Sequence, residues 1–237
     1  MNKYKFKDNL TEGIITSRPN RFIMLVNFNG KIEEAHCPST GKIGNIEFNN
    51  IPCLVSKSNN KNRRTKYTVE AISLDNPNKK EKSWIGINQN RINEYVKFFL
   101  RQGRFNKIVG NFNQLKREVK LANSRIDFLL DDTFLEVKMP LITLAGQNPQ
   151  KNKSKFNSFD RLIKHFEDLS KNTRAIVLLC YLYNAKPFEP PKTDKTNKKV
   201  KSAASKAIKQ GVEMWQANYS INKNSVSLAK YFKLDII

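Results

Sequence analysis

The stretch RAIVLLCYLYN, residues 174–184, constrains the fold most, because almost every residue in it is apolar. A run of this kind without polar alternation indicates a strand that is buried on both faces of a sheet. Helical apolar spacing precedes it at 158–171 and follows it at 202–211, where Gly211 is expected to end the helix, and 212–221 is predicted to be the last strand. Strands that alternate with helices predict an α/β domain around a mixed sheet.

The first 85 residues show a different pattern, with short strands and closely spaced turn signals. The strand expected at 21–28 leads into the dipeptide NG, which is typical of a two-residue hairpin turn. Several short strands punctuated in this way predict a small barrel or sandwich. Residues 88–104 then have helical apolar spacing and end at a glycine. The domain boundary is therefore expected near residue 85.

The charge balance favours a polyanionic partner. The chain carries 43 Lys and Arg against 21 Asp and Glu, a net charge of +22. Such an excess favours nucleic acid through the release of counterions, although a solvated lysine-rich surface remains the alternative. No apolar run reaches the roughly 18 residues of a membrane span, and no segment pairs a basic face with a large apolar one. A membrane partner is therefore not expected.

The compartment is predicted from the cysteines and the amino terminus. Cys37, Cys53 and Cys180 lie far apart and are odd in number, so no disulfide framework is expected. The first ten residues, MNKYKFKDNL, have no apolar segment behind their basic residues, so no secretory signal is expected. These observations predict a reduced, cytoplasmic protein.

The segment RIDFLLDDTFLEVKMP, residues 125–140, reads as a hairpin with Asp131 and Asp132 in the turn. One face then pairs Leu130 with Thr133, Phe128 with Leu135 and Ile126 with Val137. The other face pairs Leu129 with Phe134, Asp127 with Glu136 and Arg125 with Lys138. Two carboxylates placed directly opposite each other repel, so a proton, a neighbouring cation or a bound metal must offset the repulsion.

Two interpretations of this acidic pair stay open. Arg125 and Lys138 could complete a charge-balanced, solvated quartet. Alternatively, Glu118 could reach the same face from the segment just upstream, and three acids with one lysine would hold Mg²⁺ or Mn²⁺ through oxygen ligands. Such a site suits phosphodiester hydrolysis, with the backbone carbonyl of Val137 near the metal and with Lys138 orienting the attacking water or steadying the developing charge.

Several blocks of the chain, taken in order, resemble the sugar fermentation stimulation protein A (SfsA) family. They are RPNRF (18–22), AHCPSTG (35–41), LKREVKLANSRIDFLL (115–130), FLEVK (134–138), RLIKHFEDL (161–169) and QGVEMW (210–215). The chain departs from the family pattern at Ser39, at Met139 and Pro140, and at KFNS (155–158). The collinear blocks nevertheless span nearly the whole chain.

The resemblance implies an OB-like β-barrel over 1–85 and a nuclease-like α/β domain of the PD-(D/E)XK type over 86–237. It also implies DNA binding without sequence specificity and a link to the regulation of sugar (maltose) use. The family's nuclease signature falls on Glu118, Asp127, Glu136 and Lys138. Its basic helix motif falls on Arg161, Lys164 and His165. His165 could face a bound phosphate, or it could be a structural histidine of the helix.

The barrel loop SNNKNRRTKY, residues 58–67, is a second candidate for nucleic-acid contact. OB folds bind strands with a basic groove and aromatic platforms. The candidate residues here are Arg63, Arg64, Lys66 and Tyr67, and the alternative is a solvated loop.

The leading hypothesis is a DNA-binding protein with a metal-dependent nuclease site. A regulatory module without turnover, in which the acids are a relic, is the alternative, and an RNA-directed protein is a third possibility.

Overall fold

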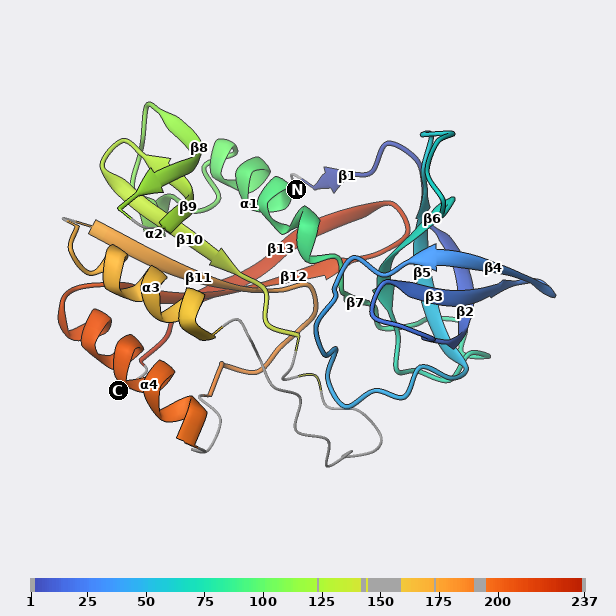
Figure 1. Cartoon of the computed structure of the whole chain (residues 1–237). Helices are drawn as coiled ribbons and strands as arrows, with labels where there is room; N and C mark the ends of the chain where they lie inside the picture. The colour runs from blue at the N-terminus through green and yellow to red at the C-terminus, as the bar shows by residue number, and fades with distance from the viewer. Residues whose placement is uncertain are drawn as a thin grey trace.

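The computed structural model describes residues 3–122, 124–141, 144, 159–172, 174–189 and 195–235. Within them the chain builds two β-sheets that lie side by side, as Figure 1 shows. No helix in these ranges is long and apolar enough to cross a membrane.

The first sheet curls into a barrel. Its order is β4-β3-β2-β5-β6-β7, and a further parallel pairing between β4 and β6 closes it. The bounds are β2 Thr11–Ser17, β3 Ile23–Phe28, β4 Lys31–His36, β5 Ile51–Lys57, β6 Tyr67–Ile72 and β7 Ile85–Gly86. This strand order is that of an OB fold, in which the third strand pairs with the fifth, so the predicted OB-like barrel is confirmed.

The predicted NG turn joins β3 to β4. Asn29 and Gly30 both have positive φ, 52° and 95°, as a type I′ turn requires. The strands on either side pair from Ile23 with His36 to Phe28 with Lys31.

The second sheet is mixed, as predicted, in the order β1-β13-β12-β11-β10-β9-β8. The pairs β10–β11 and β11–β12 are parallel and the others are antiparallel. The bounds are β1 Tyr4–Lys5, β8 Leu115–Leu121, β9 Ser124–Leu130, β10 Thr133–Lys138, β11 Arg174–Tyr181, β12 Glu213–Ile221 and β13 Ser225–Lys233. The apolar run at 174–184 is the central strand β11, which is buried on both faces.

Helices lie on both faces of this sheet (Figure 1). They are η1 Gln89–Arg91, α1 Ile92–Arg101, α2 Asn106–Val109, α3 Phe159–Leu169 and α4 Lys195–Lys209. Helix α1 covers one face, and α3 and α4 lie together on the other.

Two element predictions were wrong. The strand at 212–221 is not the last, because β13 follows it after a turn; β13 is exposed or half-buried over most of its length and so lacks the apolar run that marks β11. Helix α4 begins at Lys195 and not near residue 202, because its lysine-rich first turns form helix although they carry no apolar stripe.

One continuous apolar core joins the barrel to the α1 face of the mixed sheet, and a second fills the space under α3 and α4. Gly86 marks the junction of barrel and sheet. Its N–H donates to Leu182 O at 3.0 Å, and a Cβ at this position would lie 2.5 Å from the Cβ of Leu182. Only glycine permits this approach, so the two sheets are held closely together.

Candidate active site

The β9–β10 hairpin has the predicted register and then opens. Leu130 pairs with Thr133, Leu129 with Phe134 and Phe128 with Leu135, and the described ladder ends there. At the next position the Asp127 side chain enters the gap, and its Oδ2 accepts a hydrogen bond from the Val137 N–H at 2.8 Å. A carboxylate therefore binds the amide at the point where the two strands separate. Val137 contributes this N–H to the site, whereas the sequence suggested its carbonyl.

The neighbouring strand β8 is irregular at the same level. Arg117 pairs with Phe128 and Val119 with Ile126, and the described ladder omits Glu118 between them. Glu118 has a φ of 53°, in a region that non-glycine residues adopt at a cost of about 1–2 kcal/mol. Its side chain is exposed. The part of the chain that the structure describes contains no group of three or more His, Cys, Asp and Glu side chains placed to hold a metal, so Glu118 is not gathered with Asp127 and Glu136.

Asp127 is held from two sides. Besides Val137, the side chain of Asn93 at the start of α1 donates from Nδ2 to Asp127 Oδ1 at 2.7 Å. Burial, together with the negative charge of Glu136, raises the pKa of Asp127 to about 6, although both hydrogen bonds oppose the shift. The two predicted acids therefore lie close enough to repel each other, as the pairing implied.

Glu136 is 2% exposed, and within the described residues it has cationic or polar partners on one oxygen only. Its Oε1 accepts a hydrogen bond from Lys138 Nζ and lies 2.6 Å from Nδ1 of His165 on α3. Burial opposes ionisation of Glu136, but the His165 and Lys138 contacts outweigh it and leave its pKa below the ordinary value. The pKa of Glu136 is thus lowered, while that of its neighbour Asp127 is raised.

Two buried acceptor atoms in this cluster have no hydrogen-bond partner within the described chain, Glu136 Oε2 and Asn93 Oδ1. An unsatisfied buried acceptor costs about 1–3 kcal/mol, and a charged one more. Carboxylate and amide oxygens are the ligands that hard divalent cations prefer. Asp127 and Glu136 therefore fit Mg²⁺ or Mn²⁺ in donor type, and Glu136 Oε2 is the oxygen that a cation could satisfy.

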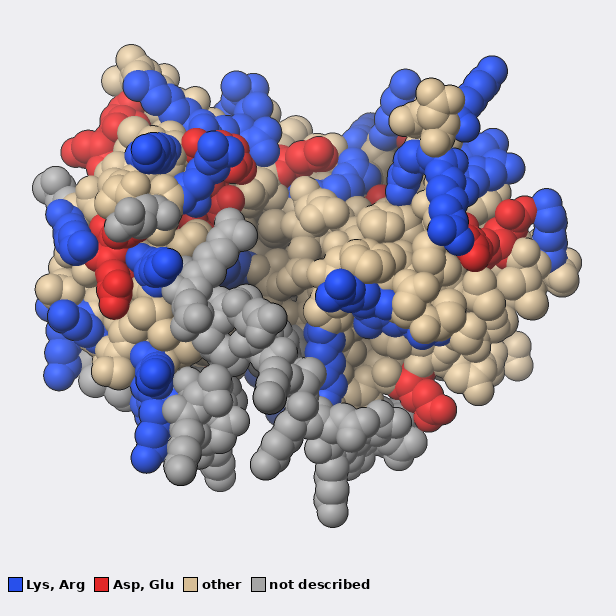
Figure 2. Space-filling model, viewed as in Figure 1, with Lys and Arg blue, Asp and Glu red and all other residues tan. Residues whose placement is uncertain are grey.

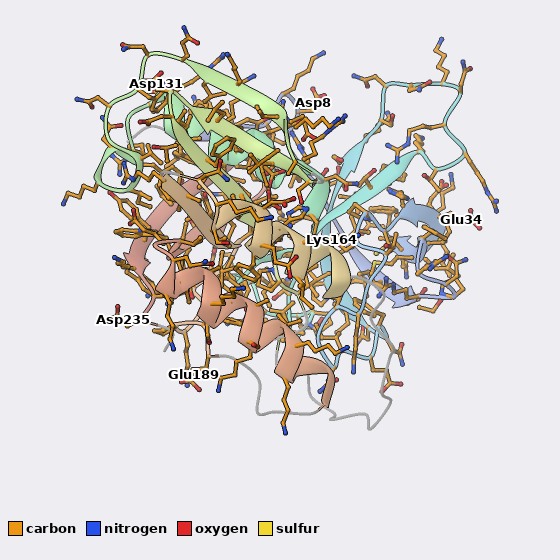
Figure 3. All side chains as sticks on the ribbon, turned by 60° about the vertical axis from the view of Figure 1, so that its left-hand side comes forward. Asp8, Glu34, Asp131, Lys164, Glu189 and Asp235 are labelled. Atoms are coloured by element: carbon orange, nitrogen blue, oxygen red, sulfur yellow. The ribbon has the colours of Figure 1, made fainter. Side chains whose placement is uncertain are left out.

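The basic helix motif is only partly described. His165 is 3% exposed and packs against Glu136, because Phe166 and Leu169 are buried on the same helix. A phosphate that binds only at the surface would not reach it, and contact with a phosphate bound beside Glu136 stays a prediction. Lys164 is exposed and is labelled on α3 in Figure 3. The side chain of Arg161 lies outside the described residues.

The predicted barrel loop carries its cations at the surface. Figure 2 shows Lys and Arg side chains gathered at the upper right, over the end of the barrel where β5 is joined to β6. Arg63 donates to Thr68 Oγ1 at 3.0 Å, and Arg64 lies 3.8 Å from Glu34 in an exposed pair. Lys66 Nζ is 5.5 Å from the ring centroid of Tyr67, which is itself half-buried.

Sequence analysis did not identify Asn93, which lies 34 residues before its partner Asp127. It also did not identify Glu136 as the partner of His165. A helical signal after residue 88 was present, but nothing in it marked this asparagine among several others.

Comparison with known protein families agrees with this architecture. The model described as the SfsA N-terminal OB domain matches residues 16–87, and the one described as the sugar fermentation stimulation protein RE domain matches residues 90–225.

Individual relatives agree as well. A sugar fermentation stimulation protein homolog from Microcystis aeruginosa is 36% identical over 138 residues, a match covering 54% of this chain and 55% of that protein. Against that relative the matched part therefore spans only about half of the length. A homolog from Clostridium botulinum is 29% identical over 225 residues, covering 92% of this chain and 94% of that protein.

A solved structure shares the fold. The structure of Pyrococcus furiosus SfsA in complex with Ca²⁺ matches with a TM-score of 0.77 and 19% identity, over 100% of this chain and 99% of that one.

Proposed function

The chain belongs to the sugar fermentation stimulation protein (SfsA) family, and we propose that it binds DNA without sequence specificity and hydrolyses phosphodiesters at Asp127 and Glu136 with a divalent metal. The observation that carries the proposal is the Oε2 of the buried Glu136, which has no partner within the described residues, beside the half-buried carboxylate of Asp127, whose pKa is raised. A structural ion pair would leave neither oxygen in need of a cation.

The ligand set that would hold Mg²⁺ or Mn²⁺ is the pair Asp127 and Glu136. A bound cation of this kind supplies Lewis acidity to a phosphate and acidifies a water molecule. The Pyrococcus furiosus protein was solved with Ca²⁺, which takes the same class of oxygen ligand.

The other side chains of the site position these acids. Asn93 and the Val137 N–H fix the orientation of Asp127. His165 and Lys138 keep Glu136 ionised. Lys138 is half-buried and so keeps access to solvent, from where its ammonium group can steady negative charge on a phosphate as the P–O bond breaks.

The electrostatics of the whole chain support a DNA partner. A net charge of +22 attracts the phosphate backbone whatever its sequence. Lys164 on α3 and Arg63, Arg64 and Lys66 on the barrel loop are exposed cations suited to phosphate contacts, which position a strand but do not read its sequence.

Incubation of plasmid and single-stranded DNA with the protein tests the proposal, with Mg²⁺, Mn²⁺ or a chelator in parallel. Cutting is expected only with metal, and it should be lost in Glu136→Ala and in Lys138→Ala. Arg125→Ala is the matched control, because Arg125 is an exposed cation on β9 outside the contacts of the acidic pair. Cutting that survives in both test variants would place the chemistry elsewhere.

A second candidate is a regulatory module that binds DNA or RNA without turnover. It is favoured by the fact that Lys138 and His165 already occupy Glu136 Oε1, and that Glu118 stays at the surface. Tight binding with no metal-dependent cutting would select it, and competition between DNA and RNA of equal length would identify its ligand. A role in regulating sugar (maltose) use is a proposal that rests on the family alone.

A further inference from the structure

The OB topology identifies two loops as candidates for ligand binding, and only one of them was predicted to bind from the sequence. In this fold the loop between the first and second strands and the loop between the fourth and fifth strands flank the ligand-binding face. Here these are residues 18–22, between β2 and β3, and residues 58–66, between β5 and β6. The second loop was predicted to bind nucleic acid, and the first was noted only as a family block.

Phe22 in the first loop is exposed to an unusual degree. It is 44% exposed, and within the described residues only Ile32 is a comparably exposed large apolar side chain. The guanidinium of Arg21 lies 4.8 Å from the centroid of the Phe22 ring. An aromatic ring at the surface with a cation against it is the combination that single-strand-binding OB folds use to stack a base and hold its phosphate.

The backbone that carries Phe22 is held by hydrogen bonds although its side chain is exposed. Asn20 Oδ1 accepts hydrogen bonds from the N–H groups of Phe22, at 2.8 Å, and of Ile23, at 3.1 Å. The carbonyl of Phe22 accepts a hydrogen bond from Cys37 N–H at 2.7 Å.

The same loop is braced on its other side. Arg18 donates from Nη2 to Arg21 O at 3.1 Å and to Ser39 O at 2.9 Å. A ring presented on an ordered backbone loses little conformational entropy when a ligand stacks on it.

One cation of the second loop, Arg63, is connected to this platform through His36. His36 is the strand partner of both Ile23 and Thr68, and Arg63 donates to the hydroxyl of Thr68. Burial and then the positive charge of Arg63 lower the pKa of His36, whose backbone contact is with Phe22. One residue thus links Phe22 on the first loop to Arg63 on the second.

Tyr67, which the sequence suggested as the stacking residue, is placed less favourably. Its ring is half-buried and packs against Phe28, with the centroids 4.9 Å apart. Phe22 is the better platform because its ring is exposed.

We propose that Phe22, flanked by Arg21 and Arg63, is a base-stacking site that gives this barrel a preference for single-stranded DNA over duplex DNA. The choice of DNA as the strand rests on the proposed function. The stacking itself requires an unpaired base, whose face is free, whereas the bases of a duplex already stack on one another.

Fluorescence anisotropy of the full chain with a labelled oligothymidylate, in chelator so that no cutting occurs, tests the site. Phe22→Ala should weaken binding roughly 5- to 150-fold, the range for loss of one base–aromatic stack. Phe22→Trp should retain the affinity. Ile32→Ala is the matched control, since Ile32 is 57% exposed on the same barrel but lies beside the NG turn, and it should bind like the parent chain.

A duplex of the same length completes the experiment. Phe22→Ala should leave duplex affinity within about twofold, because phosphate contacts dominate there. An unchanged affinity for the single strand, an equal loss on the duplex, or failure of Phe22→Trp to bind would each overturn the stacking site. Tighter binding to RNA of the same length would overturn the choice of DNA. Failure to bind either single strands or duplex would instead refute the proposed function.

Discussion

Two buried glutamates, one in each half of the molecule, have opposite surroundings. Glu70 in the barrel and Glu136 in the mixed sheet are each 2% exposed. Glu70 is satisfied on both oxygens: Ser56 Oγ donates to Oε1 at 2.6 Å, Asn88 Nδ2 donates to Oε2 at 2.8 Å, and Arg91 Nη1 lies 3.6 Å from Oε1. Glu136 has two partners on Oε1 and none within the described residues on Oε2.

The difference separates a buried acid whose hydrogen bonds are complete from one whose hydrogen bonds, within the described residues, are not. A buried carboxylate that serves only the fold is expected to be fully hydrogen-bonded, as Glu70 is. The incomplete satisfaction of Glu136, next to an acid that repels it, costs stability and is a reason to look for a function. Burial alone would not have distinguished the two.

The largest expected effect is on cleavage, measured with isosteric variants of both acids. Glu136→Gln should lower the metal-dependent cutting rate by at least about 100-fold, because the neutral amide no longer offers a charged ligand. Glu70→Gln should cut within a few-fold of the parent chain, a difference on the order of 1 kcal/mol at most. The cutting rates are measured as initial rates on plasmid DNA. If both variants lose the rate to a similar extent, Glu136 does not differ from Glu70 in its role.

Although Glu70 should matter little for cleavage, it should matter for the free energy of unfolding. Glu70→Ala should reduce the free energy of unfolding by about 2–4 kcal/mol, because Ser56, Asn88 and Arg91 are left without their acceptor. The parent chain and the variant are compared by urea unfolding in chelator. A loss below about 1 kcal/mol would mean that the barrel does not depend on this carboxylate.

Asp127→Asn should stabilise the chain in chelator by roughly 1–3 kcal/mol above pH 6, since a pKa raised to about 6 from 3.8 means that burying the ionised form is unfavourable. The parent chain loses stability relative to the variant as pH rises from 3.8 to about 6, and the difference is then constant. Asn93 can rotate its amide so that its free Oδ1 accepts from the new NH₂ group, while Val137 N–H still finds an oxygen.

Urea unfolding from pH 4 to pH 8 measures this difference, and calorimetric titration with Mn²⁺ should show weaker binding by the variant. Destabilisation of Asp127→Asn at pH 8 in chelator would show instead that the negative charge is already balanced by cations, as in a solvated quartet.

The smallest effect is expected on the salt dependence of DNA binding, when an exposed cation is removed. Arg64→Ala removes one exposed cation from the barrel loop and should reduce the slope of log K against log salt by about 1, if Arg64 contacts a phosphate. Arg101→Ala, an exposed arginine at the end of α1, is the control for a general loss of charge. Equal changes in slope for the two variants would mean that the loop has no special part in binding.

The sequence predicted the hairpin in detail because its information is local. Turn residues and two-residue alternation predicted the pairing of Leu130 with Thr133 and of the next two pairs, whereas the described ladder ends before the predicted pair of Asp127 with Glu136. The exposed position of Glu118 could not be read in this way, because it depends on a positive φ in the adjacent strand. Asn93 on α1 and His165 on α3 contact the acids from far away in the sequence. Such long-range contacts cannot be predicted from the spacing of residues.

The short strand β1 has a practical consequence. Tyr4 and Lys5 pair with Val226 and Ser225, and Phe6 N–H continues the contact to Asn224 O. Residues 4 and 5 therefore belong to the mixed sheet, and the chain enters the barrel only after them. A fragment that begins after residue 85 would lack β1, and the edge of β13 that β1 covers would be unpaired. Unpaired strand edges promote aggregation. The two halves should therefore be studied in one chain, or with the first residues supplied as a separate peptide.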